Sequence, residues 1–420
     1  MTYSIFDFFT DPVFRAPTVG SMLMCLASSL IGVLVIIRKR SLLGEALSHA
    51  SYPGVVIGLI LISFYFPMQE EIIGIGILAG AFCTSLLALF VIHKMERKFR
   101  VKSDAALCFV LSVFFGVGIL IASRVQTTHA MWYKQIQLFL YGQSATLMDI
   151  HVLTYGILCC LIIALFFLLY RSIEAVHFDV DFSKSIGIRV NFFENMIYCL
   201  LALAICIGIR SVGVVLMSGM LIAPGICARQ FTHRLSVLLV LSGFIGLISG
   251  FFGNYFSVII PEMMQVEGQK NFSLPTGPMI LLFAAFLCAI SFAIGLGTRY
   301  VRIVEHKWQC RLENALKSMW KNESIEASCA LRFWLKWQGW VDEKYHLTPE
   351  GFIYASRIVR LHRLWEVYLV DYLGQKVEKV HRNAEEMEHI ITPELEKELT
   401  LLLNNPRLDP HKQPIPEETL

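Results

Sequence analysis

Acidic and histidine side chains recur at helical spacing in two distant parts of the chain. Glu45 and His49 are four residues apart in the segment SLLGEALSHASYPG, and His362 and Glu366 repeat this spacing far downstream. Residues i and i+4 share one face of a helix, so each pair can present a carboxylate and an imidazole to the same ion. This mixture of nitrogen and oxygen ligands suits manganese, iron or zinc.

A denser group follows the second pair. His381, Glu385, Glu388 and His389 fall at positions i, i+4, i+7 and i+8. Apolar residues at helical spacing predict one helix over 381–404, which would place these four side chains along a single stripe. The alternative interpretation is the solvated, charged face of a glutamate-rich helix.

Two kinds of segment must position these residues. Charged residues make up 16% of the chain, but they gather in residues 301–420, whereas apolar runs crowd residues 1–300. Runs close to 20 apolar residues have the length of a bilayer-spanning helix. Nine candidate spans lie near 17–37, 53–66, 72–92, 105–122, 150–170, 193–209, 211–228, 236–260 and 276–298. The chain is therefore predicted to be an all-α, multi-pass membrane protein with a soluble tail.

The second span contains a proline-glycine pair, Pro53-Gly54. Proline removes a backbone donor, so the pair predicts an interruption, although the preceding residues can extend the helix toward its N-terminal side. Glu45 and His49 fall in this extension. Ionisable residues in a span are costly and are functional candidates by default. The alternative is a pair near the membrane surface with only local partners.

Arg and Lys gather in one alternate set of the predicted loops, including 38–40, 94–102 and 229–234. The positive-inside rule places these loops in the cytoplasm. The N-terminus is then outside, and the tail from residue 301 is cytoplasmic.

Several segments of the apolar half, in order, resemble the zinc/manganese/iron family of ABC importer permeases. They are SLLGEALSHASYPG (41–54), DAALCFVLSVFFGVGILIAS (104–123), FDVDFSKSIGI (178–188), VGVVLMSGMLIAPGICARQ (212–230) and LPTGPMILL (274–282). The resemblance implies a permease of the vitamin-B12-importer-like type in a bacterial cytoplasmic (inner) membrane, with Glu45 and His49 lining the metal path. The family more often has Asp at the position of Glu45, which moves the carboxylate by one methylene.

The same resemblance implies the partners. A second permease subunit, identical or homologous, an ABC ATPase and an extracytoplasmic solute-binding protein would complete the importer. The segment 178–188 would hold the coupling helix that contacts the ATPase, through Phe178, Asp179, Ser183 and Gly187. An ordinary solvated loop is the alternative. The chain has no GxxxxGK[ST] motif, so the resemblance makes it a permease subunit, not an enzyme, with ATP hydrolysis on the partner.

The tail resembles the metal-dependent repressors of the diphtheria-toxin-repressor type. The similarity lies in GWVDEKYHLTPEG, RIVRLHRLWEVYLVD, VHRNAEEMEH and DPHKQPIP, over about 340–416. Matching positions imply a divalent metal ion (Mn, Zn or Fe) in two neighbouring sites and no organic cofactor. One site would use Glu385, Glu388 and His389, and the other His362, Glu366 and His381.

The tail also departs from that family. Asn314 and Lys317 stand where the resemblance places acidic ligands, and the stretch before residue 347 is too short for a complete winged helix. Three domains are expected: a permease domain (1–300), a linker with a winged-helix remnant (301–346), and a metal-binding and dimerisation domain (347–420). DNA binding is not expected.

Two rival functions remain. A membrane-tethered, metal-responsive transcriptional regulator would need an intact helix-turn-helix, which the sequence does not show. An intramembrane metalloenzyme would need a water-activating constellation such as HExxH, which is absent from the sequence. The favoured function is a permease that moves divalent transition metals and carries a C-terminal metal-sensing domain.

Overall fold

The structure is a computed structural model that describes residues 4–65, 70–142, 144–263, 274–321 and 328–417. The described chain is helical throughout, and its only β interactions are two isolated bridges, Val341 with Leu347 and Leu408 with Pro414. The predicted all-α class is confirmed. The chain divides into two compact units, Met1–Gly295 and Leu296–Leu420.

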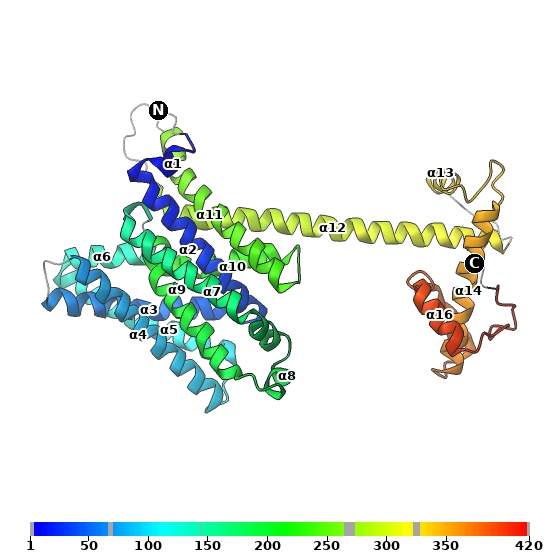
Figure 1. Ribbon diagram of the computed structural model, residues 1–420, viewed down its shortest axis with the longest axis horizontal. Coiled ribbons are helices and arrows are strands. Elements are labelled where there is room, and N and C mark those ends of the chain that lie inside the picture. Colours follow the sequence, from blue (N-terminus) through cyan, green and yellow to red (C-terminus); the bar gives the residue numbers. More distant parts are fainter. Residues whose placement is uncertain (1–3, 66–69, 143, 264–273, 322–327, 418–420) are drawn as a thin grey trace. The chain divides into compact units, whose positions relative to one another are not determined.

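The N-terminal unit contains the predicted spans (Figure 1). Its helices are α1 (Asp7–Thr10), α2 (Pro12–Ile37), α3 (Leu42–Tyr65), α4 (Glu70–Arg97), α5 (Ser103–Thr128), α6 (Ala130–Tyr141), α7 (Asp149–Phe178), α8 (Val180–Ser185), α9 (Val190–Val212), α10 (Val214–Arg229), α11 (Leu235–Met263) and α12 (Thr276–Trp320), with a 3-10 turn at Ser144–Thr146. Helix α12 extends past residue 295, so its residues 296–320 belong to the C-terminal unit.

Eight of the described helices are long and apolar enough to cross a membrane. The one predicted span that is not among these eight, 211–228, corresponds to the shorter helix α10, which has 16 residues. At about 1.5 Å per residue it is shorter than the roughly 30 Å of a bilayer's hydrocarbon core. Gly213 separates it from α9 with a φ of 95°, a conformation that favours glycine.

The predicted interruption at Pro53 is wrong. Helix α3 runs from Leu42 to Tyr65 with Pro53 inside it, so the extension on the N-terminal side is correct and is continuous with the rest of the span. Gly54 lets the neighbouring helix α4 approach closely, because a Cβ at this position would lie only 2.1 Å from the carbonyl oxygen of Gly80. This contact fixes α3, which carries Glu45 and His49, against α4.

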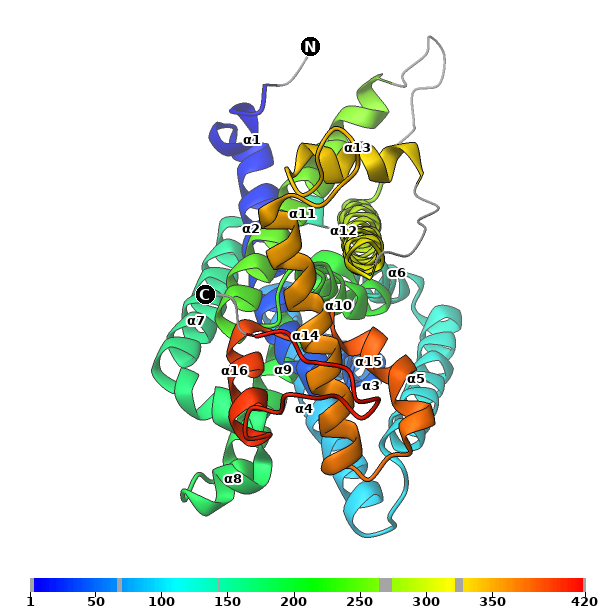
Figure 2. The same ribbon diagram turned by 90° about the vertical axis from the view of Figure 1, so that its right-hand side faces the viewer.

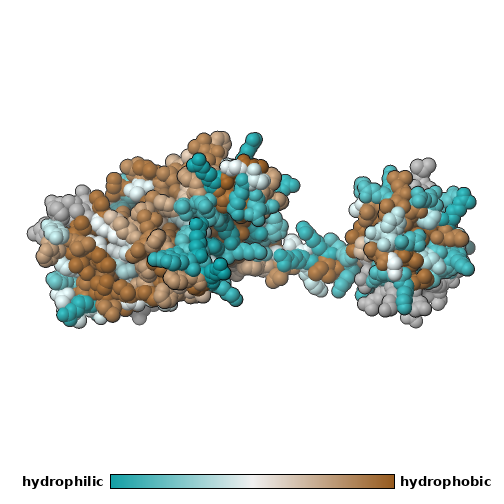
Figure 3. Space-filling view, turned by 90° about the horizontal axis from the view of Figure 1, so that it is seen from below, coloured by the Kyte–Doolittle hydropathy of each residue, from teal (hydrophilic) through white to brown (hydrophobic). Residues whose placement is uncertain are grey.

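Helix α2 lies at the centre of the N-terminal unit. It packs against α7, α9, α10 and α11, while α3 packs against α4 and α5 (Figure 1). Most of the α2 side chains are buried, including Met24, Ile31 and Val33. Hydrophobic residues also cover much of the surface of this unit (brown in Figure 3). An apolar exterior around an apolar core is what a lipid environment permits.

The C-terminal unit is built on α14 (Pro349–Asp371), with α15 (Val377–Met387) and α16 (Pro393–Leu402) packed against it (Figure 2). A second small core joins the end of α12, α13 (Cys329–Trp337) and α14. Leu316, Leu335 and Ala355 contribute to it, one from each helix. The single helix predicted over 381–404 is wrong. Thr392 and Pro393 start a new helix there, because threonine caps the N-terminus and proline favours the first helical turn.

Candidate metal centres

Glu45 and His49 lie one turn apart on α3, and both are partly buried. The imidazole of His49 packs edge-on against Phe115 of α5, with 4.6 Å between the ring centroids. Its Nδ1 is buried without a hydrogen-bond partner among the described residues. Buried polar atoms normally have a partner, so this nitrogen is an available ligand atom beside a carboxylate on the same helix face.

The described residues bring a different group into a compact cluster in the C-terminal unit. His362 and Glu366 of α14 meet His381 of α15. The Nε2 of His362 lies 3.1 Å from Oε1 of Glu366 and 3.0 Å from Nδ1 of His381. The third side of the triangle, from Nδ1 of His381 to Oε1 of Glu366, is 2.9 Å. We call these three residues the triad.

His362 and Glu366 of the triad are buried, whereas His381 is exposed to solvent. Burial alone would raise the pKa of Glu366, but hydrogen bonds from His362 and His381 outweigh it and lower that pKa to about 2. Burial opposes protonation of His362, yet its hydrogen bonds to Glu366 and Glu388 raise its pKa. The triad therefore holds a carboxylate that stays ionised and favours a positive charge next to it.

The pocket at the triad is small and polar. It has a volume of about 70 Å³, which is room for one ion and a few waters. His411 lies at its edge, with Nε2 4.0 Å from Oε1 of Glu366. His411 is not among the ligands predicted from the sequence. Its position in the repressor-like segment DPHKQPIP is the signal that could have indicated it.

The second predicted site is not assembled in the structure. Helix α15 ends at Met387, so Glu388 and His389 lie beyond the helix and leave the predicted stripe. Glu385 is exposed, and no hydrogen bond or ion pair among the described residues joins it to Glu388 or His389. The prediction that Glu385, Glu388 and His389 converge on one ion is therefore not supported by the geometry.

Glu388 and His389, the two residues that follow α15, both form ion pairs with side chains of α12. Lys317 pairs with Glu388, with 2.8 Å between Nζ and Oε2, and Glu313 pairs with Nδ1 of His389. Glu388 also contacts Nδ1 of His362, the ring nitrogen opposite the triad. Burial would raise the pKa of Glu388, but the hydrogen bond from His362 and the charge of Lys317 lower it.

The predicted coupling segment forms the six-residue helix α8 and its flanks. Phe178 is 92% exposed, and Asp179 caps α8 by accepting hydrogen bonds from the backbone N–H groups of Asp181 and Phe182. Ser183 is buried and donates its hydroxyl to the Asp179 carbonyl. Gly187 ends the turn with a φ of 84° and open space around it. Together these features present an exposed apolar surface on a capped, rigid turn.

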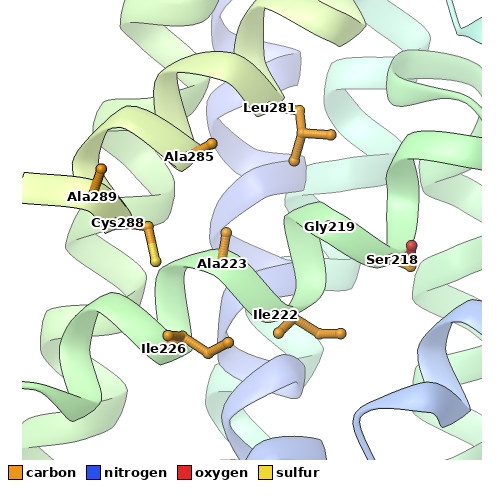
Figure 4. Close-up of a pocket in the computed structure, with 9 residues that line it drawn as sticks. All are labelled: Ser218, Gly219, Ile222, Ala223, Ile226, Leu281, Ala285, Cys288 and Ala289. Carbon is orange, nitrogen blue, oxygen red and sulfur yellow. The ribbon is translucent and has the colours of Figure 1, made fainter. Parts of the chain in front are cut away.

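An apolar pocket of about 450 Å³ lies between α10 and α12 (Figure 4). Its lining is aliphatic except for Ser218 and the thiol of Cys288, which faces Ile226 and Ala223 in the close-up. Such a lining offers few of the oxygen and nitrogen atoms that divalent metals prefer. Glu45 and His49 on α3 offer such atoms, whereas this pocket offers only a hydroxyl and a thiol.

Comparison with known proteins decides the family. Residues 10–295 match the model of the ABC 3 transport family, which is more than half of the chain. The chain belongs to the ABC 3 transport family. Residues 348–417 match a second model, the iron dependent repressor, metal binding and dimerisation domain. Both resemblances found in the sequence are thereby confirmed.

Relatives of this ABC 3 family chain include one that matches along almost the whole of both chains. A "probable metal transport system membrane protein" of Chlamydia trachomatis is 36% identical, and the alignment covers 98% of each chain. The manganese transport system membrane protein MntC of Bacillus subtilis is 31% identical over 74% of this chain and 68% of its own. The zinc transport system membrane protein TroC of Treponema pallidum is 31% identical over 70% of this chain and 92% of its own.

A solved structure supports the fold of this ABC 3 family chain. PsaBC of Streptococcus pneumoniae, in complex with a Fab, aligns with a TM-score of 0.59 and 23% identity, covering 71% of this chain and 98% of that one. The N-terminal unit therefore shares the fold of that structure.

Proposed function

We propose that this chain is the permease subunit of an ATP-driven importer that moves divalent transition metal ions into the bacterial cytoplasm. The observation that carries the proposal is the unpartnered Nδ1 of His49 one turn from Glu45, inside a family whose relatives are named for manganese and zinc transport. A carboxylate and an imidazole at this spacing bind such ions without chemical change.

The importer needs partners that this chain does not supply. We assign ATP hydrolysis to a separate ABC ATPase and ion delivery to an extracytoplasmic solute-binding protein, with a second permease subunit completing the pathway. Following the positive-inside rule, we assign the N-terminus to the outside and the C-terminal unit to the cytoplasm. In this arrangement we assign the ATPase contact to α8 and the preceding end of α7, because Phe182 and Phe178 expose 56% and 92% of their surface.

Uptake into vesicles tests the transport function. Vesicles containing this chain, its ATPase and the binding protein are expected to accumulate radiolabelled manganese or zinc only when ATP is supplied on the cytoplasmic side. Competition by unlabelled Mn, Zn, Fe, Ca and Mg ranks the preference. Accumulation that is independent of ATP, or that is blocked equally by calcium and magnesium, would contradict the proposal.

Removing the exposed aromatic side chains at the turn from α7 to α8 is expected to uncouple transport. The double change Phe178→Ala and Phe182→Ala should lower ATP-driven uptake and ATPase binding by at least about 30-fold, because the loss of one aromatic anchor from an interface costs about 2 kcal/mol. Co-purification and uptake are measured side by side. Lys184→Ala is the matched control on α8, where Lys184 pairs with exposed Asp181. Equal losses in the control would show that α8 is an ordinary loop.

The C-terminal unit is proposed to bind one class of ion at the triad. The three ligand atoms lie 2.9, 3.0 and 3.1 Å from one another, close enough to face one ion. Two histidines and one carboxylate suit manganese, iron or zinc. The unit would report cytoplasmic metal to the transporter.

A further inference from the structure

The ammonium group of Lys317 is buried in the C-terminal unit beside the carboxylate of Glu388 and the ring of His362. Its Nζ is 2.9 and 2.8 Å from the two carboxylate oxygens of Glu388, and 3.1 Å from Nδ1 of His362. The Lys317 side chain is 7% exposed and that of Glu388 is fully buried. Both oxygens of this carboxylate therefore face a cation that the chain itself provides.

The Lys317–Glu388 pair is joined to the triad through the ring of His362. Nδ1 of His362 contacts Glu388 and Lys317, while Nε2 of the same ring faces Glu366 and His381. A histidine that ligates a metal through one nitrogen usually has a carboxylate on the other, which fixes its orientation. Glu388 occupies that second position, so it orients a ligand and is not itself free to act as one.

A divalent ion at Glu388 would have to displace the ammonium. Metal-to-oxygen distances of about 2.0–2.2 Å and the observed 2.8 Å ammonium contact cannot share one site. Lys317 belongs to the same chain and is held in position by the packing of α12. Its ammonium group therefore competes with a free metal ion for the Glu388 carboxylate at a high effective concentration. Removing one member of a buried ion pair leaves an uncompensated charge, which strongly disfavours the displaced state.

The neighbouring residue is held in the same way. His389 contacts Glu313, which lies one turn before Lys317 on α12 and also accepts hydrogen bonds from Gln309 and Tyr354. Two consecutive residues after α15 are thus bound by opposite charges on one face of α12. The pair closes α12 onto α14 and α15.

We propose that Lys317 is a built-in cation that takes the place of a second divalent ion, so that the C-terminal unit binds a single ion per chain, at the triad. This inference rests on the proposed role of the triad as an ion site. It also assigns Glu388 and His389, both expected to be metal ligands, to the packing of α12 against the rest of the unit.

Metal stoichiometry in the full-length chain tests the inference. The purified chain in detergent, carrying His49→Ala so that the membrane site does not contribute, is titrated with Mn(II) and followed by electron paramagnetic resonance. One Mn(II) per chain with an uncoupled spectrum is expected. Lys317→Glu should bind a second Mn(II), and the spectrum should broaden because two neighbouring ions couple. Lys397→Glu, exposed on α16 and outside the lining of the triad pocket, introduces the same charge change and should still bind one.

A stability measurement covers the case in which Lys317→Glu does not fold. Lys317→Met keeps the apolar stem and removes the charge, so its metal-free melting temperature should fall well below that of Lys397→Met, and Mn(II) should restore it. Unchanged stability of Lys317→Met, or two ions bound by the chain with Lys317 intact, would overturn the inference. If Glu366→Ala leaves binding intact, the ion site at the triad fails instead, while the stability comparison still decides the role of Lys317.

Discussion

Replacing His49 with alanine is expected to reduce ATP-driven metal uptake by more than about 100-fold, beyond the 10- to 100-fold effect typical of residues that only orient a ligand. The imidazole offers a buried Nδ1 that no described residue engages, so its loss removes a ligand atom without breaking an internal hydrogen bond. Glu45→Ala should have an effect of the same order, because it removes the charge that offsets a divalent ion. Initial rates in vesicles measure both variants.

The matched control is another histidine of the same unit. His93 on α4 is also partly buried, but its Nδ1 already contacts the carbonyl oxygen of Leu89 at 2.9 Å. His93→Ala should retain uptake within a few fold of the unaltered chain, at equal membrane abundance and equal ATPase binding. Normal transport in both His49→Ala and Glu45→Ala would remove these residues from the metal path.

Glu366→Gln is expected to weaken Mn(II) binding by the C-terminal unit by about 100-fold or more. The carboxylate supplies the only negative charge of the triad and contacts both of its histidines. An amide keeps the shape but loses the charge, so affinity for a divalent ion should fall while the packing of α14 is preserved. Calorimetry on the full-length chain with His49→Ala measures the effect.

Glu385→Gln separates this site from the arrangement that helical spacing predicted. Glu385 is exposed on α15, away from the contacts that join the other ligands, so its replacement should change Mn(II) affinity by less than about twofold. A large loss in Glu385→Gln together with a small one in Glu366→Gln would reverse the assignment and restore the predicted site.

Most of the membrane architecture could be predicted from the sequence. In a bilayer the backbone must satisfy its hydrogen bonds internally, so an apolar run of sufficient length is necessarily a helix. Two local features needed the structure. Pro53 stays inside α3, and the run that was divided at residue 211 breaks at Gly213 and leaves α10 short. Both outcomes depend on how neighbouring helices pack.

The pairs at i and i+4 were also determined locally. Glu45 with His49 and His362 with Glu366 each lie on one helix, and the helical repeat alone brings their side chains to one face. No tertiary contact is needed to create either pair. The sequence therefore identified the helix-borne half of each proposed metal site.

The tertiary structure decided which of the remaining residues meet. The hydrophobic periodicity predicted a helix through residue 389, but α15 ends at Met387. Within α15, His381 contacts the other two residues of the triad, whereas Glu385 is exposed. Glu388 and His389 meet Lys317 and Glu313, residues more than 70 positions earlier in the chain. Spacing along one helix cannot predict such a contact, because the Lys317 ammonium that pairs with Glu388 belongs to another helix. The two side chains meet only when the unit folds.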